Sequence, residues 1–106
     1  MFLFAKKEMD MAAARQFWSW FAENEQWIID NLKTNGMDVV WAIDAQIKPV
    51  FPYFKKELEF QLGYNEGVGE FFFFHFGNKN LISDGQKLGE LMPESLCKSW
   101  TFILEK

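Results

Sequence analysis

Residues 17 to 29 read Phe-Trp-Ser-Trp-Phe-Ala-Glu-Asn-Glu-Gln-Trp-Ile-Ile and contain three of the five tryptophans of the protein. On a helical wheel of about 100° per residue, Phe17, Phe21 and Ile28 fall in one arc, with tryptophans on both sides of it. Polar and charged side chains occupy the opposite face. The pattern predicts an amphipathic helix that packs against other elements and does not span a membrane.

The composition predicts a globular protein with an aromatic core. A chain of 106 residues is expected to form one domain, residues 1–106. Aromatic residues make up 19% of it, and each such side chain can bury about 150–250 Å². The single Cys97 cannot form an internal disulfide, and the apolar residues 1–5 are too short for a signal peptide. We therefore expect a cytoplasmic location.

The charge distribution argues against two classes of partner. The formal net charge is −4, and the longest basic runs are pairs of lysines. Nucleic acids and anionic membranes attract clustered Lys and Arg side chains, so neither is an expected partner.

Cap and stop signals set the expected limits of the first helix. Asp10 can cap its start, and the Thr-Asn-Gly sequence that follows Lys33 suits its end. Upstream of this helix, residues 1–5 could form a short edge strand or a packed arm.

Residues 38–48 fit two structures. Their apolar residues alternate as in a strand, but several of them also share one face of a helix. Asp38 as an N-cap and Pro49 as a stop signal favour the helix.

The middle of the chain predicts a β-hairpin. Residues 57–62 alternate between polar and apolar side chains, as in a strand with one buried face. The glycine-rich residues 63–69 are expected to form the turn, and residues 70–76 the second strand.

A short helix and a final strand complete the expected order. Ser83 and Gln86 have the spacing of a capping box, which is expected to open a short helix. Pro93 is expected to end this helix, and a strand is expected over residues 99–104. The order is two helices, a hairpin, a helix and a strand. It predicts an α+β fold with a small, mainly antiparallel sheet and helices packed on one face.

Three motifs resemble those of a family of uncharacterised bacterial proteins. They are Phe-Trp-x-Trp-Phe-x-x-Asn-Glu at residues 17–25, Phe-Gln-Leu-Gly at 60–63 followed by Glu70 and an apolar strand, and an ending from Pro93 to Trp-x-Phe at 100–102. The resemblance covers residues 15–104 and implies an α+β domain from a bacterial cytoplasm. It brings no established activity, cofactor or catalytic residue. The Phe71–Phe76 run departs from the pattern, which has smaller and more polar residues at alternate positions.

Asn24 and Glu25 are polar residues inside the apolar arc of the first helix. An unpaired buried polar group costs about 1–3 kcal/mol, so both need partners. In one reading they bond a backbone edge, Arg15 or a lysine and fix how the helix docks. In the other they lie at the rim of a pocket lined by Trp18 and Trp20, which binds a small molecule or a cation of a partner.

The run from Phe71 to Phe76 makes both faces of its strand apolar. Phe72, Phe74 and Phe76 share one face, and His75 lies on the other among phenylalanines, where a packed neutral imidazole is expected. If the helices cover only one face of this strand, the other exposes an aromatic stripe that monomeric proteins rarely leave uncovered. The cover could be residues 1–5 or the connector 49–54, a second copy or another protein, or a ligand.

These features favour a non-enzymatic protein-binding module. The sequence contains no zinc-binding or nucleophile motif, and we expect no catalytic residue, metal or cofactor. A small acidic protein suits a basic partner, as in immunity-like proteins, and self-association is the other expectation. The alternative is a small-ligand or enzymatic pocket that uses Asn24, Glu25 and aromatic residues. The candidate surface comprises Trp18, Trp20, Asn24, Glu25, Trp27, Phe72, Phe74, His75 and Phe76.

Overall fold

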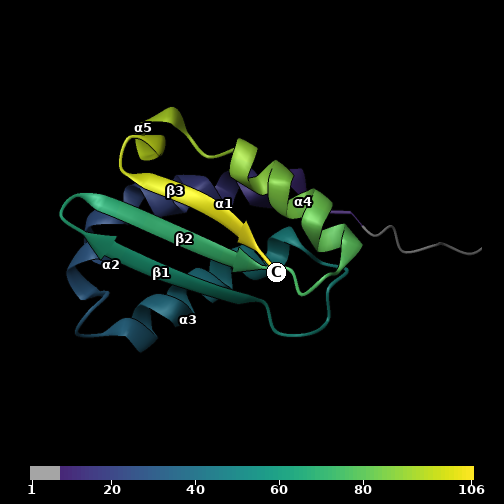
Figure 1. Cartoon of the computed structure of the whole chain (residues 1–106), viewed down its shortest axis with the longest axis horizontal. Coiled ribbons are helices and arrows are strands. Elements are labelled where there is room, and N and C mark those ends of the chain that lie inside the picture. The colour runs from purple at the N-terminus through teal and green to yellow at the C-terminus, as the bar shows by residue number, and fades with distance from the viewer. Residues whose placement is uncertain (1–7) are drawn as a thin grey trace, which may run out of the picture.

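The computed structural model describes residues 8–106 and contains a three-stranded sheet (Figure 1). The strands β1 (Glu59–Asn65), β2 (Val68–Phe74) and β3 (Trp100–Glu105) lie in the order β1-β2-β3. β1 and β2 are antiparallel, whereas β2 and β3 are parallel, so the sheet is mixed and not mainly antiparallel as expected. The parallel pair arises because the chain returns from β2 to β3 through helices, whereas a tight turn can join only antiparallel strands.

Helices pack against one face of this sheet. The first three are α1 (Met11–Glu23), α2 (Glu25–Asn31) and α3 (Gly36–Ile47), followed by the 3₁₀ turn η1 (Lys48–Val50). The crossover contains α4 (Lys79–Glu90) and α5 (Glu94–Cys97). Figure 1 shows α1, α2 and α3 together behind the sheet, and α4 and α5 beside β3. The predicted α+β class is confirmed.

The first predicted helix is two helices that break at Asn24. Asp10 caps α1 as predicted, because its carboxylate accepts a hydrogen bond from the Ala13 N–H at 3.0 Å. Asn24 has φ −109° and ψ 10°, and its side-chain amide donates to the Trp20 carbonyl at 2.9 Å. Asn side chains compete in this way for helix carbonyls. The single helix from Asp10 to Lys33 was therefore a wrong prediction.

The ambiguous segment is the helix α3, so the strand reading of residues 38–48 is wrong. Its N-cap is Asn35, and Asp38 lies inside the first turn. A carboxylate in the first turn is still favourable, because it faces the positive end of the helix dipole.

The hairpin is confirmed, with a shorter turn than the predicted residues 63–69. Glu66 and Gly67 alone form it, with φ angles of 51° and 82°. Two residues with positive φ make the turn type whose twist matches that of the flanking strands.

The start of α4 was also predicted wrongly. The helix begins at Lys79, because the Asn78 side chain accepts hydrogen bonds from the N–H groups of Asn80 and Leu81 at 3.0 and 3.1 Å. The predicted capping box at Ser83 therefore lies inside the helix. Pro93 precedes α5 and does not directly end α4.

The core is an aromatic cluster between α1 and the sheet. Phe17 and Phe21 of α1 lie 6.1 and 6.2 Å from Phe71 of β2, measured between ring centroids, and Phe21 meets Trp100 of β3 edge-on at 5.0 Å. Phe73 stacks on Phe51 at 5.3 Å, so the 49–54 connector covers this inner face of β2. The prediction for residues 1–5 falls outside the described residues.

Candidate functional site

The sheet face turned away from the helices carries alternate side chains of all three strands. The register places Glu59, Phe74 and Glu105 in one row across the strands. The next row is Gln61, Phe72 and Ile103, and the third contains Glu70 and Thr101. We call this set the outer face: Glu59, Gln61, Glu70, Phe72, Phe74, Thr101, Ile103 and Glu105.

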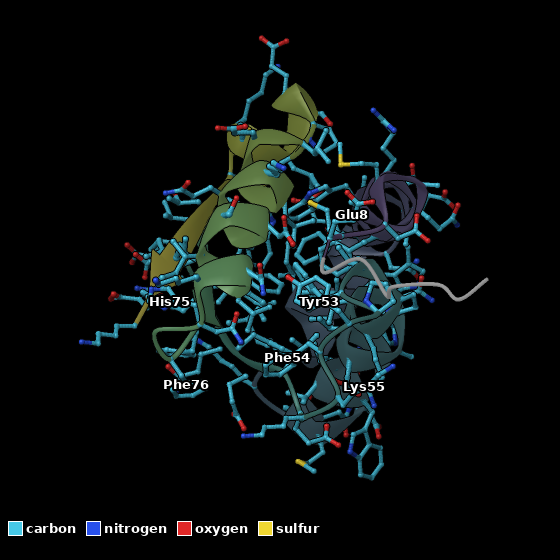
Figure 2. The ribbon with its side chains drawn as sticks, turned by 90° about the vertical axis from the view of Figure 1, so that its right-hand side faces the viewer. Glu8, Tyr53, Phe54, Lys55, His75 and Phe76 are labelled. Atoms are coloured by element: carbon cyan, nitrogen blue, oxygen red, sulfur yellow. The ribbon has the colours of Figure 1, made fainter. Side chains whose placement is uncertain are left out.

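An apolar stripe crosses the middle of the outer face and continues past the end of β2. Phe72, Phe74 and Ile103 are half-buried. Phe76 follows the strand, is 65% exposed, and stacks on Phe74 at 6.3 Å between ring centroids. Its φ of 50° lies in the left-handed region, which is uncommon for a bulky residue. The turn thus holds an exposed aromatic ring against the stripe, at the end of the molecule seen in Figure 2.

All charged side chains of the three strands are carboxylates. Glu59, Glu70 and Glu105 are exposed and lie on the outer face, and the strands contain no Lys or Arg. Aromatic rings and carboxylates both attract cations. The outer face is therefore suited to a positively charged surface.

His75 caps a turn beside this face. Its Nδ1 accepts a hydrogen bond from the Gly77 N–H at 2.9 Å, an arrangement that leaves Nε2 to carry the proton of a neutral imidazole. The ring borders a cavity of about 350 Å³ that Phe54, Glu59 and Phe76 also line. His75 orders the turn that holds Phe76.

The predicted site residues of the aromatic helix lie on the other side of the sheet. Trp18 is 2% exposed, and its indole N–H donates to the Leu88 carbonyl at 2.8 Å, which ties α1 to α4. Trp20 is half-buried against the core, and Trp27 is 39% exposed. The structure therefore groups Phe72, Phe74 and Phe76 and separates them from these tryptophans.

Asn24 and Glu25 both have hydrogen-bond partners. Asn24 bonds the Trp20 carbonyl of its own helix, and the Glu25 carboxylate accepts from the indole N–H of Trp100 at 2.9 Å. The Trp100 partner of Glu25 was not among those expected, because it lies 75 residues away in the sequence.

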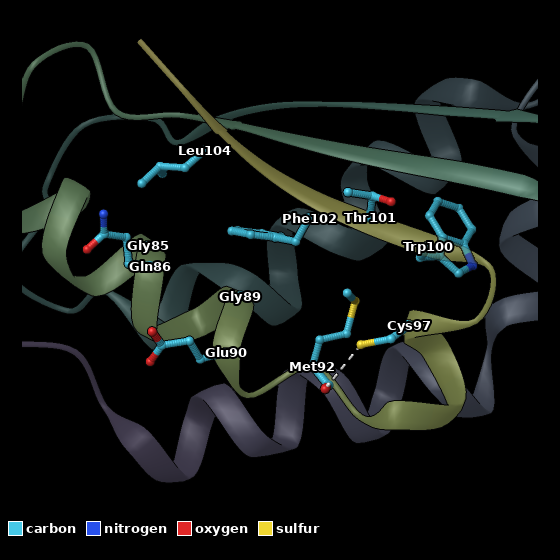
Figure 3. A pocket seen from close by; sticks show the side chains of 10 residues that line it. All are labelled: Gly85, Gln86, Gly89, Glu90, Met92, Cys97, Trp100, Thr101, Phe102 and Leu104. Atoms are coloured by element: carbon cyan, nitrogen blue, oxygen red, sulfur yellow. Dashed lines mark hydrogen bonds between the residues drawn. The ribbon is translucent and has the colours of Figure 1, made fainter.

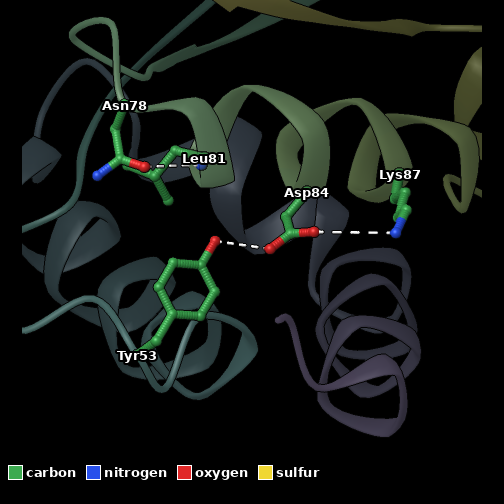
Figure 4. A network of polar contacts seen from close by, with 5 residues as sticks. All are labelled: Tyr53, Asn78, Leu81, Asp84 and Lys87. Atoms are coloured by element: carbon green, nitrogen blue, oxygen red, sulfur yellow. Dashed lines mark hydrogen bonds and ion pairs between the residues drawn. The ribbon is translucent and has the colours of Figure 1, made fainter. Parts of the chain in front are cut away.

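A second polar contact escaped the sequence reasoning (Figure 4). The Tyr53 hydroxyl donates to the Asp84 carboxylate at 2.6 Å, and Lys87 approaches the other carboxylate oxygen at 4.0 Å. Burial, and then the bond to Asp84, raise the pKa of Tyr53 above its usual range. Only the Asp84–Lys87 spacing of three residues was visible in the sequence. The contact joins the 49–54 connector to α4.

A groove of about 670 Å³ runs between α4 and β3 (Figure 3). Phe102 and Leu104 of β3 and Met92, which follows α4, form much of its apolar lining, and the Cys97 thiol contacts the Met92 carbonyl at one end at 3.7 Å. The lining residues are Gly85, Gln86, Gly89, Glu90, Met92, Cys97, Trp100, Thr101, Phe102 and Leu104.

No protein-family model, curated protein or solved structure matches the chain. The resemblance to uncharacterised bacterial proteins therefore rests on the motif residues alone. Within residues 8–106, no helix combines the length and apolar character needed to cross a membrane. Over the same described range, no three His, Cys, Asp or Glu side chains converge to hold a metal ion.

Proposed function

We propose that this protein is a non-enzymatic binding module of a bacterial cytoplasm, whose outer face binds a basic protein partner. One observation carries the proposal: Phe74 lies in register between Glu59 and Glu105, on a sheet face whose charged side chains are all acidic. An arginine or lysine of the partner can pair with either carboxylate while its alkyl stem covers the Phe74 ring.

The two kinds of side chain contribute differently. Burial of the Phe72, Phe74 and Phe76 stripe supplies the apolar part of the affinity, at about 25 cal/mol per Å² of apolar surface removed from water. The carboxylates speed the encounter and select a partner of opposite charge. An immunity-like protein that neutralises a basic target would use such a surface.

A different protein is favoured over a second copy as the partner. Two copies that met through the outer face would bring Glu59, Glu70 and Glu105 of one near those of the other. Like charges juxtaposed at an interface cost several kcal/mol. The stripe alone would favour self-association, whereas the charges on both sides of it oppose self-association.

The alternative of a ligand or enzymatic pocket at Asn24 and Glu25 has less support. Both side chains already bond Trp20 and Trp100, and Trp18 is buried in the core. A ligand at this place would have to compete with these bonds for the same side chains.

Paired charge reversals test the proposal. The full chain, the double variant Glu59→Lys/Glu105→Lys and the matched control Glu23→Lys/Asp30→Lys serve as bait in extracts of the source bacterium. The control changes the net charge equally, at exposed positions of α1 and α2. A captured protein is identified by mass spectrometry, and its affinity for each bait is then measured with purified components.

We expect the outer-face variant to bind the partner at least about tenfold more weakly, a change of about 1.4 kcal/mol, and the control to bind within about twofold. Equal affinity for both variants would place the partner elsewhere on the protein. A small molecule that co-purifies with all three baits in place of a protein would support the pocket alternative.

A further inference from the structure

The free edge of β3 presents unused backbone groups. The bonds from the Gly69 N–H to the Ser99 carbonyl and from the His75 N–H to the Glu105 carbonyl mark the two ends of the parallel ladder. Between them, Thr101 and Ile103 turn their backbone groups toward β2. Trp100, Phe102 and Leu104 consequently turn theirs away from it, and no hydrogen bond is found for these groups among residues 8–106.

This free edge borders the α4–β3 groove. Glycines allow α4 to lie close to β3, since a Cβ atom on Gly89 would be 2.8 Å from the Phe102 ring and one on Gly85 would be 2.7 Å from the Leu104 side chain. The remaining space of about 670 Å³ has apolar walls from Met92 and Phe102 and an acidic rim at Glu90. The edge and the groove together have the features of a site for an extended peptide, which needs both backbone partners and side-chain room.

We propose that an extended segment of the basic partner adds to β3 as a fourth strand. This inference rests on the proposed function, because the segment belongs to the same partner. Its inward side chains are apolar and occupy the groove. Its outward side chains continue the outer face beside Ile103 and Glu105, and cross-strand pairing favours a lysine or arginine next to Glu105.

The backbone geometry favours a strand over other shapes of partner. Every second residue of β3, at Trp100, Phe102 and Leu104, turns its backbone groups away from β2. This is the spacing with which one added strand pairs along an edge. A flat protein surface could contact the outer face but would leave these groups without partners. The acidic side chains at the rim and on the outer face select a segment that carries positive charge.

The test uses the peptide acetyl-Lys-Val-Lys-Val-Lys-Val-amide as probe and the full chain labelled with ¹⁵N. With the peptide at millimolar concentration, we expect amide hydrogen exchange at Trp100, Phe102 and Leu104 to slow at least about tenfold, because each newly bonded amide is protected. The amides of β1 that point away from β2, at Phe60, Leu62 and Tyr64, serve as the internal control. Unchanged exchange at β3, or equal protection of both edges, would overturn the proposal.

Two N-methylated versions of the peptide separate strand addition from attraction between charges. One carries methyl groups on the lysine amides and the other on the valine amides, so each blocks one edge of the added strand. We expect one version to lose binding and the other to keep it. Binding of both versions with the affinity of the parent peptide would overturn strand addition.

Charge reversals then distinguish binding at the edge of β3 from binding elsewhere on the outer face. Glu90→Lys is expected to bind the peptide at least threefold more weakly than the equally charged control Glu23→Lys. Glu59→Lys, on the far strand, is expected to bind the peptide within twofold of that control. If Glu59→Lys lowers the affinity for the peptide and Glu90→Lys does not, strand addition is overturned and the proposed function stays in place. If the peptide adds to β3 as a strand but the captured partner binds Glu59→Lys/Glu105→Lys with normal affinity, the proposed function is overturned instead.

Discussion

At the scale of residues, single hydrogen bonds join segments that are far apart in the chain. Glu25 bonds Trp100 across 75 residues, and Tyr53 bonds Asp84 across 31. Trp100 is 2% exposed and Asp84 is 4% exposed, so each polar group depends on its partner in place of water. These two contacts attach α2 to β3 and the 49–54 connector to α4.

Removal of the Glu25 carboxylate should destabilise the protein. Glu25→Ala leaves the buried indole N–H of Trp100 without its acceptor, which costs about 1–3 kcal/mol of the free energy of unfolding. In a domain of this size, each 1 kcal/mol lowers the melting temperature by about 4–8 °C. Thermal unfolding followed by circular dichroism measures the change. Glu23→Ala, at an exposed position of α1, is the control, and an unchanged melting temperature in Glu25→Ala would mean that the bond contributes nothing.

The Tyr53 contact should make stability depend on alkaline pH. The pKa of Tyr53 is raised in the folded protein, so the folded state favours the neutral phenol while the unfolded chain ionises at about pH 10. The stabilisation is therefore complete below pH 10 and is lost as the pH rises further. Urea unfolding at pH 8 and pH 11 should show a smaller loss of stability in Tyr53→Phe than in the wild type. An equal loss of stability in the two proteins would contradict the role of this contact.

At the scale of elements, β2 separates two functions by the alternation of its side chains. Phe71 and Phe73 face the helices and are at most 1% exposed, whereas Phe72 and Phe74 face outward and are half-buried. Successive residues of one strand therefore belong to the core and to the proposed binding surface. This division explains why an unbroken run of phenylalanines can occur in a folded protein.

Substitution of neighbouring phenylalanines should expose that division. Phe73→Ala empties a fully buried site and should cost about 3–5 kcal/mol, whereas Phe74→Ala should cost less than about 1.5 kcal/mol, because Phe74 is already partly in water. Chemical denaturation of both variants measures the difference. Equal costs would mean that the outer face is packed as tightly as the core and is not a free surface.

The elements differ in how far their sequences specify them. The alternation in residues 57–62 and the glycines after it were enough to predict the hairpin, because strand alternation and turn conformation are local properties. The break at Asn24 and the cap at Asn78 were missed. Asn is compatible with several backbone conformations, and the surrounding packing selects among them.

At the scale of the whole molecule, the acidic outer face should keep the protein monomeric. Self-association through it would oppose three carboxylates of one copy to three of another, and such repulsion is strongest at low ionic strength. Light scattering at micromolar concentration and low salt should give the mass of one chain, 12.5 kDa. A stable dimer under these conditions would contradict the choice of a different protein as partner.

The amino-acid sequence by itself determined the α+β class, the hairpin and the amphipathic helices, since hydrophobic periodicity and turn chemistry act over a few residues. It also identified the Phe71–Phe76 run and the acidic charge as unusual. Tertiary structure determined which face of that run is covered, through the stacking of Phe51 on Phe73. It also aligned Glu59, Phe74 and Glu105 across three strands and gave Glu25 its partner. These relations join residues tens of positions apart, so they depend on the register of the sheet and the docking of the helices, which no local pattern specifies.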